Sequence, residues 1–159
     1  MDHLWSPWRY KYIASAAPNA GCVFCRARDG KDDRESFVVW RGAQTFIILN
    51  IFPYTSGHLM IVPFEHEASL AALDEATTTE MMETAKRAQI AIVAEYRPDG
   101  FNIGMNLGAA AGAGIAEHLH LHVVPRWTGD ANFVSIIGET RVLPEDLVVT
   151  YEKLKKHFV

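Results

Sequence analysis

The chain has 159 residues, of which 49% are hydrophobic and 21% charged, with a formal net charge of −4. This length corresponds to about one domain, placed at residues 1–159, and the composition is typical of a folded protein. The acidic balance argues against a surface that coats nucleic acid or an anionic membrane. No apolar run approaches the roughly 20 residues that span a bilayer, and the first residues lack a signal-peptide pattern, so we expect a cytoplasmic protein.

The first third of the chain predicts an irregular arm followed by three strands. Residues 1–20 mix aromatic, basic and small residues without a regular period. Residues 36–50 contain two β-rich runs around a short polar break, which predicts a hairpin. A third strand is expected from about residue 58 to 62, where Pro63 limits its length.

A helical period replaces the strand pattern between Leu73 and Tyr96. The threonines that precede it are candidate N-caps, and Arg97-Pro98 predicts its end. The apolar positions recur at steps of three and four residues: Met81, Ala85, Ala88, Ile92 and Tyr96. We therefore expect the main helix of the fold here.

The last third predicts strands at about 101–106 and 116–125, separated by the small-residue loop 107–114, and a short strand at 133–137. A C-terminal helix, opened by Pro144, is indicated by spaced apolar residues. These residues are Leu147, Tyr151, Leu154 and Phe158. Without an internal repeat or a linker, the chain predicts one α+β domain with a mainly antiparallel sheet of about five strands.

The stretch A-E-H-L-H-L-H-V-V-P-R-W, residues 116–127, has histidines at alternate positions. They are His118, His120 and His122. In a strand, alternate side chains share a face, so the three imidazoles would lie opposite Leu119, Leu121 and Val123, which we expect to be core. Imidazoles buried in a hydrophobic layer would be desolvated without obvious hydrogen-bond partners, so we favour a functional cleft over core histidines.

This stretch resembles the motif of the histidine triad (HIT) family, His-φ-His-φ-His-φ-φ with φ apolar, at every position from 118 to 124. Asn50 and the segment G-H-L-M-I-V-P that contains His58 resemble the family's ribose-binding and fourth-histidine segment. The resemblance covers about residues 22–127. It implies a HIT-like fold and a nucleotidyl hydrolase or transferase whose middle histidine attacks an α-phosphate.

The resemblance implies a separate role for each histidine. His120 would be the nucleophile, because neutral imidazole is nucleophilic near pH 7 and a phosphorylated histidine readily passes on its nucleotidyl group. The family orients this ring through the backbone carbonyl of the first triad histidine, here His118. His122 and His58 would donate to phosphate oxygens, and His122 would also assist the leaving group.

The loop G-A-A-A-G-A-G before the triad is expected to approach phosphate through backbone N–H groups at Gly112 and Gly114, although a plain connection is the alternative. Asn106 resembles a phosphate-contacting asparagine of the family. Gly114 departs from the family pattern, in which a glutamine or serine side chain binds phosphate at this position. This contact must therefore come from the backbone or be absent.

The chain has two cysteines, Cys22 and Cys25, in a C-x-x-C spacing. Two such thiolates can face one tetrahedral ion, and two imidazoles would complete a Cys2His2 zinc site. His66 and His118 are the available partners, and several HIT relatives hold zinc with residues at equivalent positions. We expect a structural zinc site, because four protein ligands leave no position open for water; a free or redox-active dithiol is the alternative.

Two further segments, L-W-S-P-W-R at 4–9 and H-L-H-V-V-P-R-W-T-G-D-A-N-F at 120–133, resemble the bacterial diadenosine tetraphosphate phosphorylase branch of the family. Trp5, Trp8, Tyr10 and Tyr12, in and just after the first segment, are expected at an interface or in the core, and coverage of a nucleotide is the alternative. The resemblance implies a homodimer or higher oligomer that cleaves dinucleoside polyphosphates with orthophosphate as second substrate. The alternatives are a HIT phosphoramidase or dinucleoside polyphosphate hydrolase and, in a different class, a zinc-stabilised nucleotide sensor without turnover.

Overall fold

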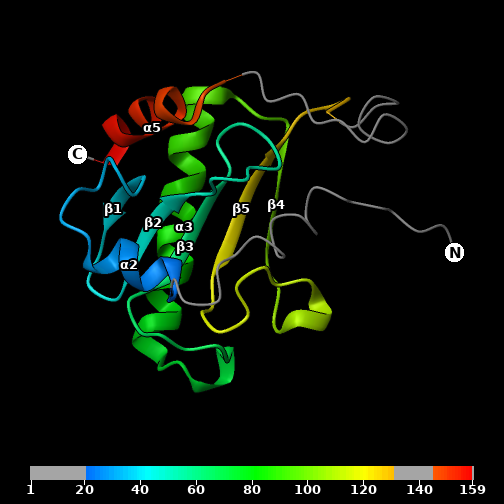
Figure 1. Cartoon of the computed structure of the whole chain (residues 1–159). Coiled ribbons are helices and arrows are strands. Elements are labelled where there is room, and N and C mark those ends of the chain that lie inside the picture. Colours follow the sequence, from blue (N-terminus) through cyan, green and yellow to red (C-terminus); the bar gives the residue numbers. More distant parts are fainter. Residues whose placement is uncertain (1–20, 131–144, 159) are drawn as a thin grey trace, which may run out of the picture.

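The computed structural model describes residues 21–130 and 145–158. Its centre is a five-stranded sheet with the strand order β1-β2-β3-β5-β4, and every pair of neighbouring strands is antiparallel (Figure 1). The strands are β1 (Val38–Arg41), β2 (Thr45–Leu49), β3 (Leu59–Pro63), β4 (Gly100–Met105) and β5 (Leu121–Arg126). The predicted α+β class and antiparallel sheet are confirmed.

The predicted hairpin forms between β1 and β2, with a register irregularity between Val38 and Trp40. The third predicted strand is shifted by one residue, since His58 precedes β3 and Pro63 ends it. The triad strand is shorter than predicted, because β5 begins only at Leu121. His118 and His120 therefore lie in the extended segment that leads into the strand.

The main helix, α3 (Glu75–Tyr96), confirms the helical period. Its N-cap is Asp74, whose carboxylate accepts a hydrogen bond from the backbone N–H of Thr77, so the prediction that a threonine caps the helix was wrong. A carboxylate at this position also interacts favourably with the helix dipole. Arg97, in the left-handed conformation with φ of 47°, ends the helix as predicted. No helix in the described part of the chain is long and apolar enough to cross a membrane.

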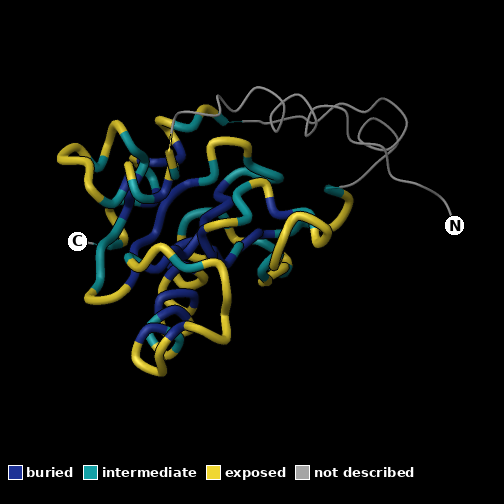
Figure 2. The backbone as a smooth tube through the Cα atoms, turned by 60° about the horizontal axis from the view of Figure 1, so that its bottom comes forward, coloured by how far each residue is buried: buried dark blue, intermediate teal, exposed yellow. Residues whose placement is uncertain are grey.

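Side chains of the sheet alternate between two hydrophobic cores, one on each face. Ile47 and Leu49 of β2 belong to the core under α3, whereas Phe46 and Ile48 belong to the core on the opposite face. The second core is covered by α2 (Val23–Asp29), a helix that we did not predict from the sequence. In Figure 1, α2 lies in front of the sheet and α3 behind it, and Figure 2 shows the buried strands between the exposed connections.

The predicted C-terminal helix is α5 (Leu147–Lys155), which packs beside α3 and is capped by the side chain of Asp146 (Figure 1). Short 3-10 turns lie at Leu70–Ala72, Ala109–Ala111 and Lys156–Phe158. Three predicted features fall outside the described residues: the arm at 1–20, the strand at 133–137 and Pro144. The fold thus brings α2, the end of β3 and the triad segment together on one face of the sheet.

Candidate functional site

The ring of His120 is held in one tautomer by the backbone. Its Nδ1 lies 2.9 Å from the carbonyl oxygen of His118. Because a carbonyl can only accept, Nδ1 carries the proton and Nε2 keeps its lone pair. Burial lowers the pKa of His120, while the bond to His118 and the charge of Glu117 act in the opposite direction. The neutral ring is therefore held in the tautomer whose Nε2 has a free lone pair, which makes this nitrogen a candidate nucleophile.

A second pair of histidines, His58 and His122, forms a directed chain of hydrogen bonds. The backbone N–H of Tyr54 donates to His58 Nδ1 at 3.1 Å, so the proton of this ring is on Nε2. His58 Nε2 lies 2.9 Å from His122 Nδ1 and donates to it. His122 must then carry its own proton on Nε2, which makes it a hydrogen-bond donor.

The buried position of His58 corrects its predicted role. Its side chain is 0% exposed and its two ring nitrogens bind Tyr54 and His122, so the ring does not donate to a bound phosphate as expected. Its effect is indirect, since it fixes the tautomer and orientation of His122. The expectation that buried imidazoles would lack hydrogen-bond partners was also wrong, because the ring of each triad histidine has at least one such partner.

The four predicted metal ligands converge. Cys22 Sγ and Cys25 Sγ lie 3.3 and 3.7 Å from His118 Nδ1, and Cys25 Sγ lies 3.2 Å from His66 Nδ1. All four ligand atoms are within 4.8 Å of one another. Zn–S bonds of about 2.3 Å and Zn–N bonds of about 2.0 Å in a tetrahedron separate neighbouring ligand atoms by roughly 3.3–3.8 Å. The donor set and its spacing therefore fit zinc.

The tautomer of His118 suits this arrangement. Its Nε2 donates to the carbonyl oxygen of Pro63 at 2.9 Å, so Nδ1, which faces the two sulfurs, has a lone pair for a metal ion. The side chain of His118 thus belongs to the thiol cluster, whereas its carbonyl oxygen orients His120. One residue connects the candidate metal site to the candidate nucleophile.

Phe24 makes a second connection between the two sites. Phe24 lies on α2, between Cys22 and Cys25 in the sequence, and is 2% exposed. Its ring centroid is 4.9 Å from that of His120 and 5.4 Å from that of His118. The helix that carries one thiol and adjoins the other therefore also packs directly against the candidate nucleophile. Sequence reasoning missed Phe24, because a single aromatic residue inside C-x-x-C has no periodic signal.

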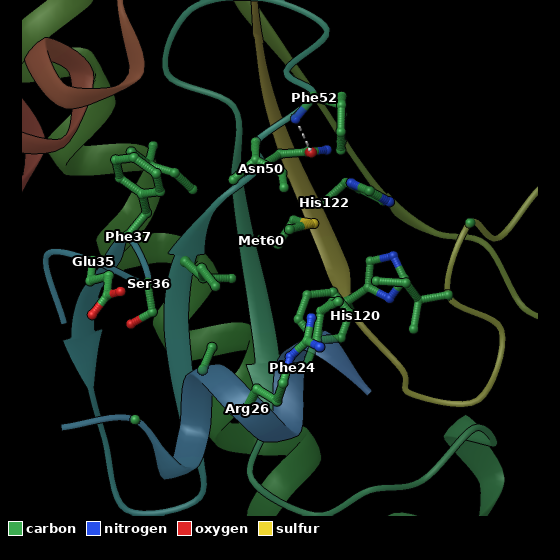
Figure 3. Close-up of a pocket in the computed structure, with 18 of the residues that line it drawn as sticks. Phe24, Arg26, Glu35, Ser36, Phe37, Asn50, Phe52, Met60, His120 and His122 are labelled. Carbon is green, nitrogen blue, oxygen red and sulfur yellow. Dashed lines mark hydrogen bonds between the residues drawn. The ribbon is translucent and has the colours of Figure 1, made fainter. Parts of the chain in front are cut away.

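A cavity of about 630 Å³ opens beside these rings (Figure 3). One wall is α2, the opposite side is formed by the end of β2 with Asn50, and His120 and His122 face the space between them. Asn106 and Gly114 also line it, but Gly112 does not. A space of this size accommodates a nucleotide-sized molecule, and its lining combines apolar side chains with polar and charged ones.

The comparisons with known proteins assign this arrangement to a family. The HIT domain model matches residues 31–129. The chain belongs to the HIT family. It is 41% identical over 152 residues to a HIT relative named AP-4-A phosphorylase from Mycobacterium tuberculosis, covering 91% of this chain and 78% of the relative. It is 30% identical over 116 residues to the adenosine 5'-monophosphoramidase of Saccharomyces cerevisiae, covering 73% and 69% of the two chains.

The HIT assignment extends to solved structures. A Zn-bound histidine triad family protein from Mycobacterium smegmatis superimposes with a TM-score of 0.70 at 28% identity, covering 86% of this chain and 92% of that one. The named relatives of this HIT protein include enzymes that act on nucleotides, so the chain belongs to a family of nucleotide hydrolases and transferases.

The fold brings most of the predicted HIT site residues to one cavity. His120, His122, Asn50, Asn106 and Gly114 line it. The remaining residues lie outside it: His118 in the metal cluster, His58 behind His122, and Gly112 elsewhere in its loop. The side chain of Asn50 accepts from the backbone N–H of Phe52 at 2.9 Å, which fixes its orientation at the rim (Figure 3).

Proposed function

We propose that this HIT protein is a dinucleoside polyphosphate phosphorylase that works through a nucleotidyl-His120 intermediate. The observation that carries the proposal is the orientation of His120, whose Nδ1–H is bound by a carbonyl and whose ring faces the cavity. The 41% identity to a relative named AP-4-A phosphorylase supports this substrate class. The yeast phosphoramidase relative supports the alternative of a HIT hydrolase.

The proposed reaction has two displacements at the α-phosphorus. In the first, the Nε2 lone pair of His120 forms a P–N bond while the P–O bond to the distal nucleotide breaks, and His122 Nε2–H is the available proton donor to the departing oxygen. In the second, an oxygen of orthophosphate attacks, the P–N bond breaks, and a nucleoside diphosphate leaves. With diadenosine tetraphosphate, the products are ATP and then ADP.

Other cavity residues would position the substrate. We propose that Asn50 binds the ribose hydroxyls, and that Asn106 and the backbone at Gly114 bind oxygens of the α-phosphate, all three being residues that line the cavity. No side chain is available at Gly114, so the backbone N–H must make this contact. These groups would stabilise the charge that develops on the phosphate.

We propose zinc as the resident metal of the thiol cluster, held by Cys22, Cys25, His66 and His118. Four protein ligands leave no open coordination position, so the ion would supply structural stability and no chemistry. Because both cysteines are on or next to α2, the metal site would fix this wall of the cavity. Both thiols are free of disulfide bonds, which agrees with a reducing, cytoplasmic location.

We also propose a homodimer, formed through the β4 edge of the sheet. Among the described residues, β4 has a strand neighbour on one side only. Its Ile103 is 44% exposed and pairs with Val123, so it points to the same face as α3, where Ile90 is 69% and Val93 46% exposed. An exposed edge strand beside apolar residues favours pairing with a second copy. Ile103→Lys should shift the mass measured by sedimentation velocity to that of a monomer, whereas an unchanged mass would exclude this interface.

One assay separates the candidate functions. Diadenosine tetraphosphate is incubated with and without orthophosphate, and the products are separated by ion exchange. ADP and ATP that form only with phosphate support the phosphorylase, whereas AMP formed without phosphate supports a hydrolase. Absence of turnover together with tight AMP binding would support a nucleotide sensor.

The nucleophile is tested with His120→Ala, with His157→Ala as a matched histidine control on the Lys156–Phe158 turn. His120→Ala should abolish turnover and the acid-labile nucleotidyl-protein adduct while zinc remains bound. His157→Ala should leave both activity and adduct unchanged. Near-normal turnover by His120→Ala would exclude His120 as the nucleophile.

A further inference from the structure

The cavity contains a fixed positive charge on α2 that the two displacement steps do not use. Four charged residues line the cavity within the described part of the chain: Arg26, Lys31, Asp32 and Glu35. In Figure 3 the side chain of Arg26 points from α2 past Phe24 toward His120, whereas Glu35 lies at the other end. A guanidinium is protonated at every physiological pH, so the reacting end of the cavity carries a permanent cation.

The groups already assigned to the α-phosphate include no guanidinium or ammonium group. His120 presents the Nε2 lone pair, because its Nδ1–H is bound by the His118 carbonyl, His122 presents an N–H, and Asn106 presents an amide. A dinucleoside polyphosphate brings several negative charges beyond the phosphorus that is attacked. Neutral hydrogen-bond donors do not balance these charges, and a guanidinium binds phosphate oxygens in a bidentate, charge-assisted geometry.

We propose that Arg26 binds the phosphates of the leaving nucleotide and, in the second step, the orthophosphate that replaces it. This inference rests on the proposed function and names the residue that selects its substrate class. When the P–O bond breaks, the departing phosphate gains negative charge, so Arg26 stabilises the transition state more than the bound substrate. A phosphoramidate has a leaving amine that carries no negative charge after protonation, and therefore gains little from Arg26.

The test compares Arg26→Gln and Arg26→Lys on two substrates, diadenosine tetraphosphate with orthophosphate and adenosine 5'-phosphoramidate. Arg87→Gln is the matched control, because it removes the same charge from the exposed side of α3, where Arg87 lies 5.1 Å from the ring centre of Trp40. Arg26→Gln should lower kcat/KM for the tetraphosphate by about 10- to 100-fold, the usual effect of losing a charge-assisted hydrogen bond. The kcat/KM for the phosphoramidate should change by less than about threefold.

Arg26→Lys should recover part of the tetraphosphate activity, since it keeps the charge and loses the bidentate geometry. Equal losses on both substrates would overturn the proposal, because they indicate contact with the α-phosphate or the nucleoside. Zinc content and melting temperature, measured for each variant, should match the wild type.

A binding measurement keeps the proposal testable even where the proposed function fails. ATP has the same α-phosphate as AMP and two phosphates beyond it. Titration calorimetry should show that Arg26→Gln weakens ATP binding by about 10-fold or more and AMP binding by much less. An unchanged ratio of the ATP and AMP affinities would overturn the role of Arg26, independently of any turnover.

Discussion

Replacing Phe24 with alanine should disrupt the histidine site more than it disrupts the sheet. Phe24 is 2% exposed and belongs to the smaller core, on the α2 face of the sheet, together with Phe46 and Met60. The core under α3 contains none of these residues. A cavity at position 24 therefore loosens α2, the helix that carries one thiol and adjoins the other, while α3 stays packed on the opposite face.

The size of the effect follows from the burial of the ring. Truncation of a buried phenylalanine to alanine costs about 3–5 kcal/mol, including the loss of aromatic contacts worth about 0.5–1.5 kcal/mol. Domains of this size have total stabilities of about 5–15 kcal/mol, so the variant should remain folded. At about 2–4 °C per kcal/mol, the melting temperature should fall by roughly 10 °C. Phe24→Leu, which keeps most of the volume, should cost about 1 kcal/mol.

The decisive assay follows zinc release and unfolding in the same urea titration, with a colorimetric chelator for the metal and far-UV circular dichroism for the fold. Phe24→Ala should release zinc at a lower urea concentration than that which unfolds the sheet, and its kcat/KM should fall. Met81→Ala, a cavity in the other core at a residue 1% exposed, is the matched control and should lose zinc only on global unfolding. Wild-type zinc retention and wild-type kcat/KM in Phe24→Ala would refute the coupling between α2 and the site.

Three other changes test how far activity and stability can be separated. Gly57→Ala should lower the free energy of unfolding by about 1–2 kcal/mol, because Gly57 has φ of +78° and a Cβ there would lie 3.2 Å from the Tyr96 ring. It should also lower kcat, because the next residue is His58. Gly100→Ala is the control, since a Cβ there would meet nothing within 4 Å, and equal kinetics in the two variants would contradict this reasoning. Glu80→Gln should lower the free energy of unfolding, measured by urea titration, by about 1–2 kcal/mol without changing kcat, because the Glu80 carboxylate accepts three hydrogen bonds at the start of β2. A changed kcat would count against a purely structural role. The Asp130 carboxylate accepts hydrogen bonds from the guanidinium of Arg126, which lowers the pKa of Asp130 to about 2. The stability that this pair contributes is therefore complete above the pKa of the unfolded state, near 3.8, and is lost as pH falls toward 2. Since Arg126 is 42% exposed, solvent screening reduces this contribution to about 1 kcal/mol. The melting temperature of Asp130→Asn should therefore fall less steeply below pH 4 than that of the wild type. The same pH dependence in both proteins would exclude a contribution of the Asp130–Arg126 pair.

The sequence predicted those elements whose patterns are local. The period of α3 reflects burial of one helix face against the sheet, and the β-rich runs of β2 and β3 reflect strands that are buried on both faces. The helix was found where expected, and β3 is shifted by one residue. The helix α2 was missed because it has seven residues, of which only Phe24 and Ala27 are buried. A helix this short has no stability of its own, so its position depends on the core and thiol cluster that distant segments supply.

The candidate site was predicted by residue type more completely than by orientation. The C-x-x-C motif, His66 and His118 were expected together, and the structure brings them together. The role of His58 was not accessible from the sequence, because its tautomer is set by a backbone N–H of the preceding turn, at Tyr54. Hydrogen-bond direction depends on local backbone geometry, which a motif of residue identities does not encode.

The double use of His118 determines when, during synthesis, the protein can become active. A nascent chain that has reached the end of α3 already contains both thiols and His66, but the fourth proposed ligand is His118, whose Nδ1 must reach Cys22 across 96 positions in the sequence. The same residue provides the carbonyl that orients His120, two positions later. Closure of the proposed metal cluster and orientation of the proposed nucleophile therefore depend on the same residue, and a chain that ends before His118 lacks both the fourth proposed ligand and the carbonyl that orients His120.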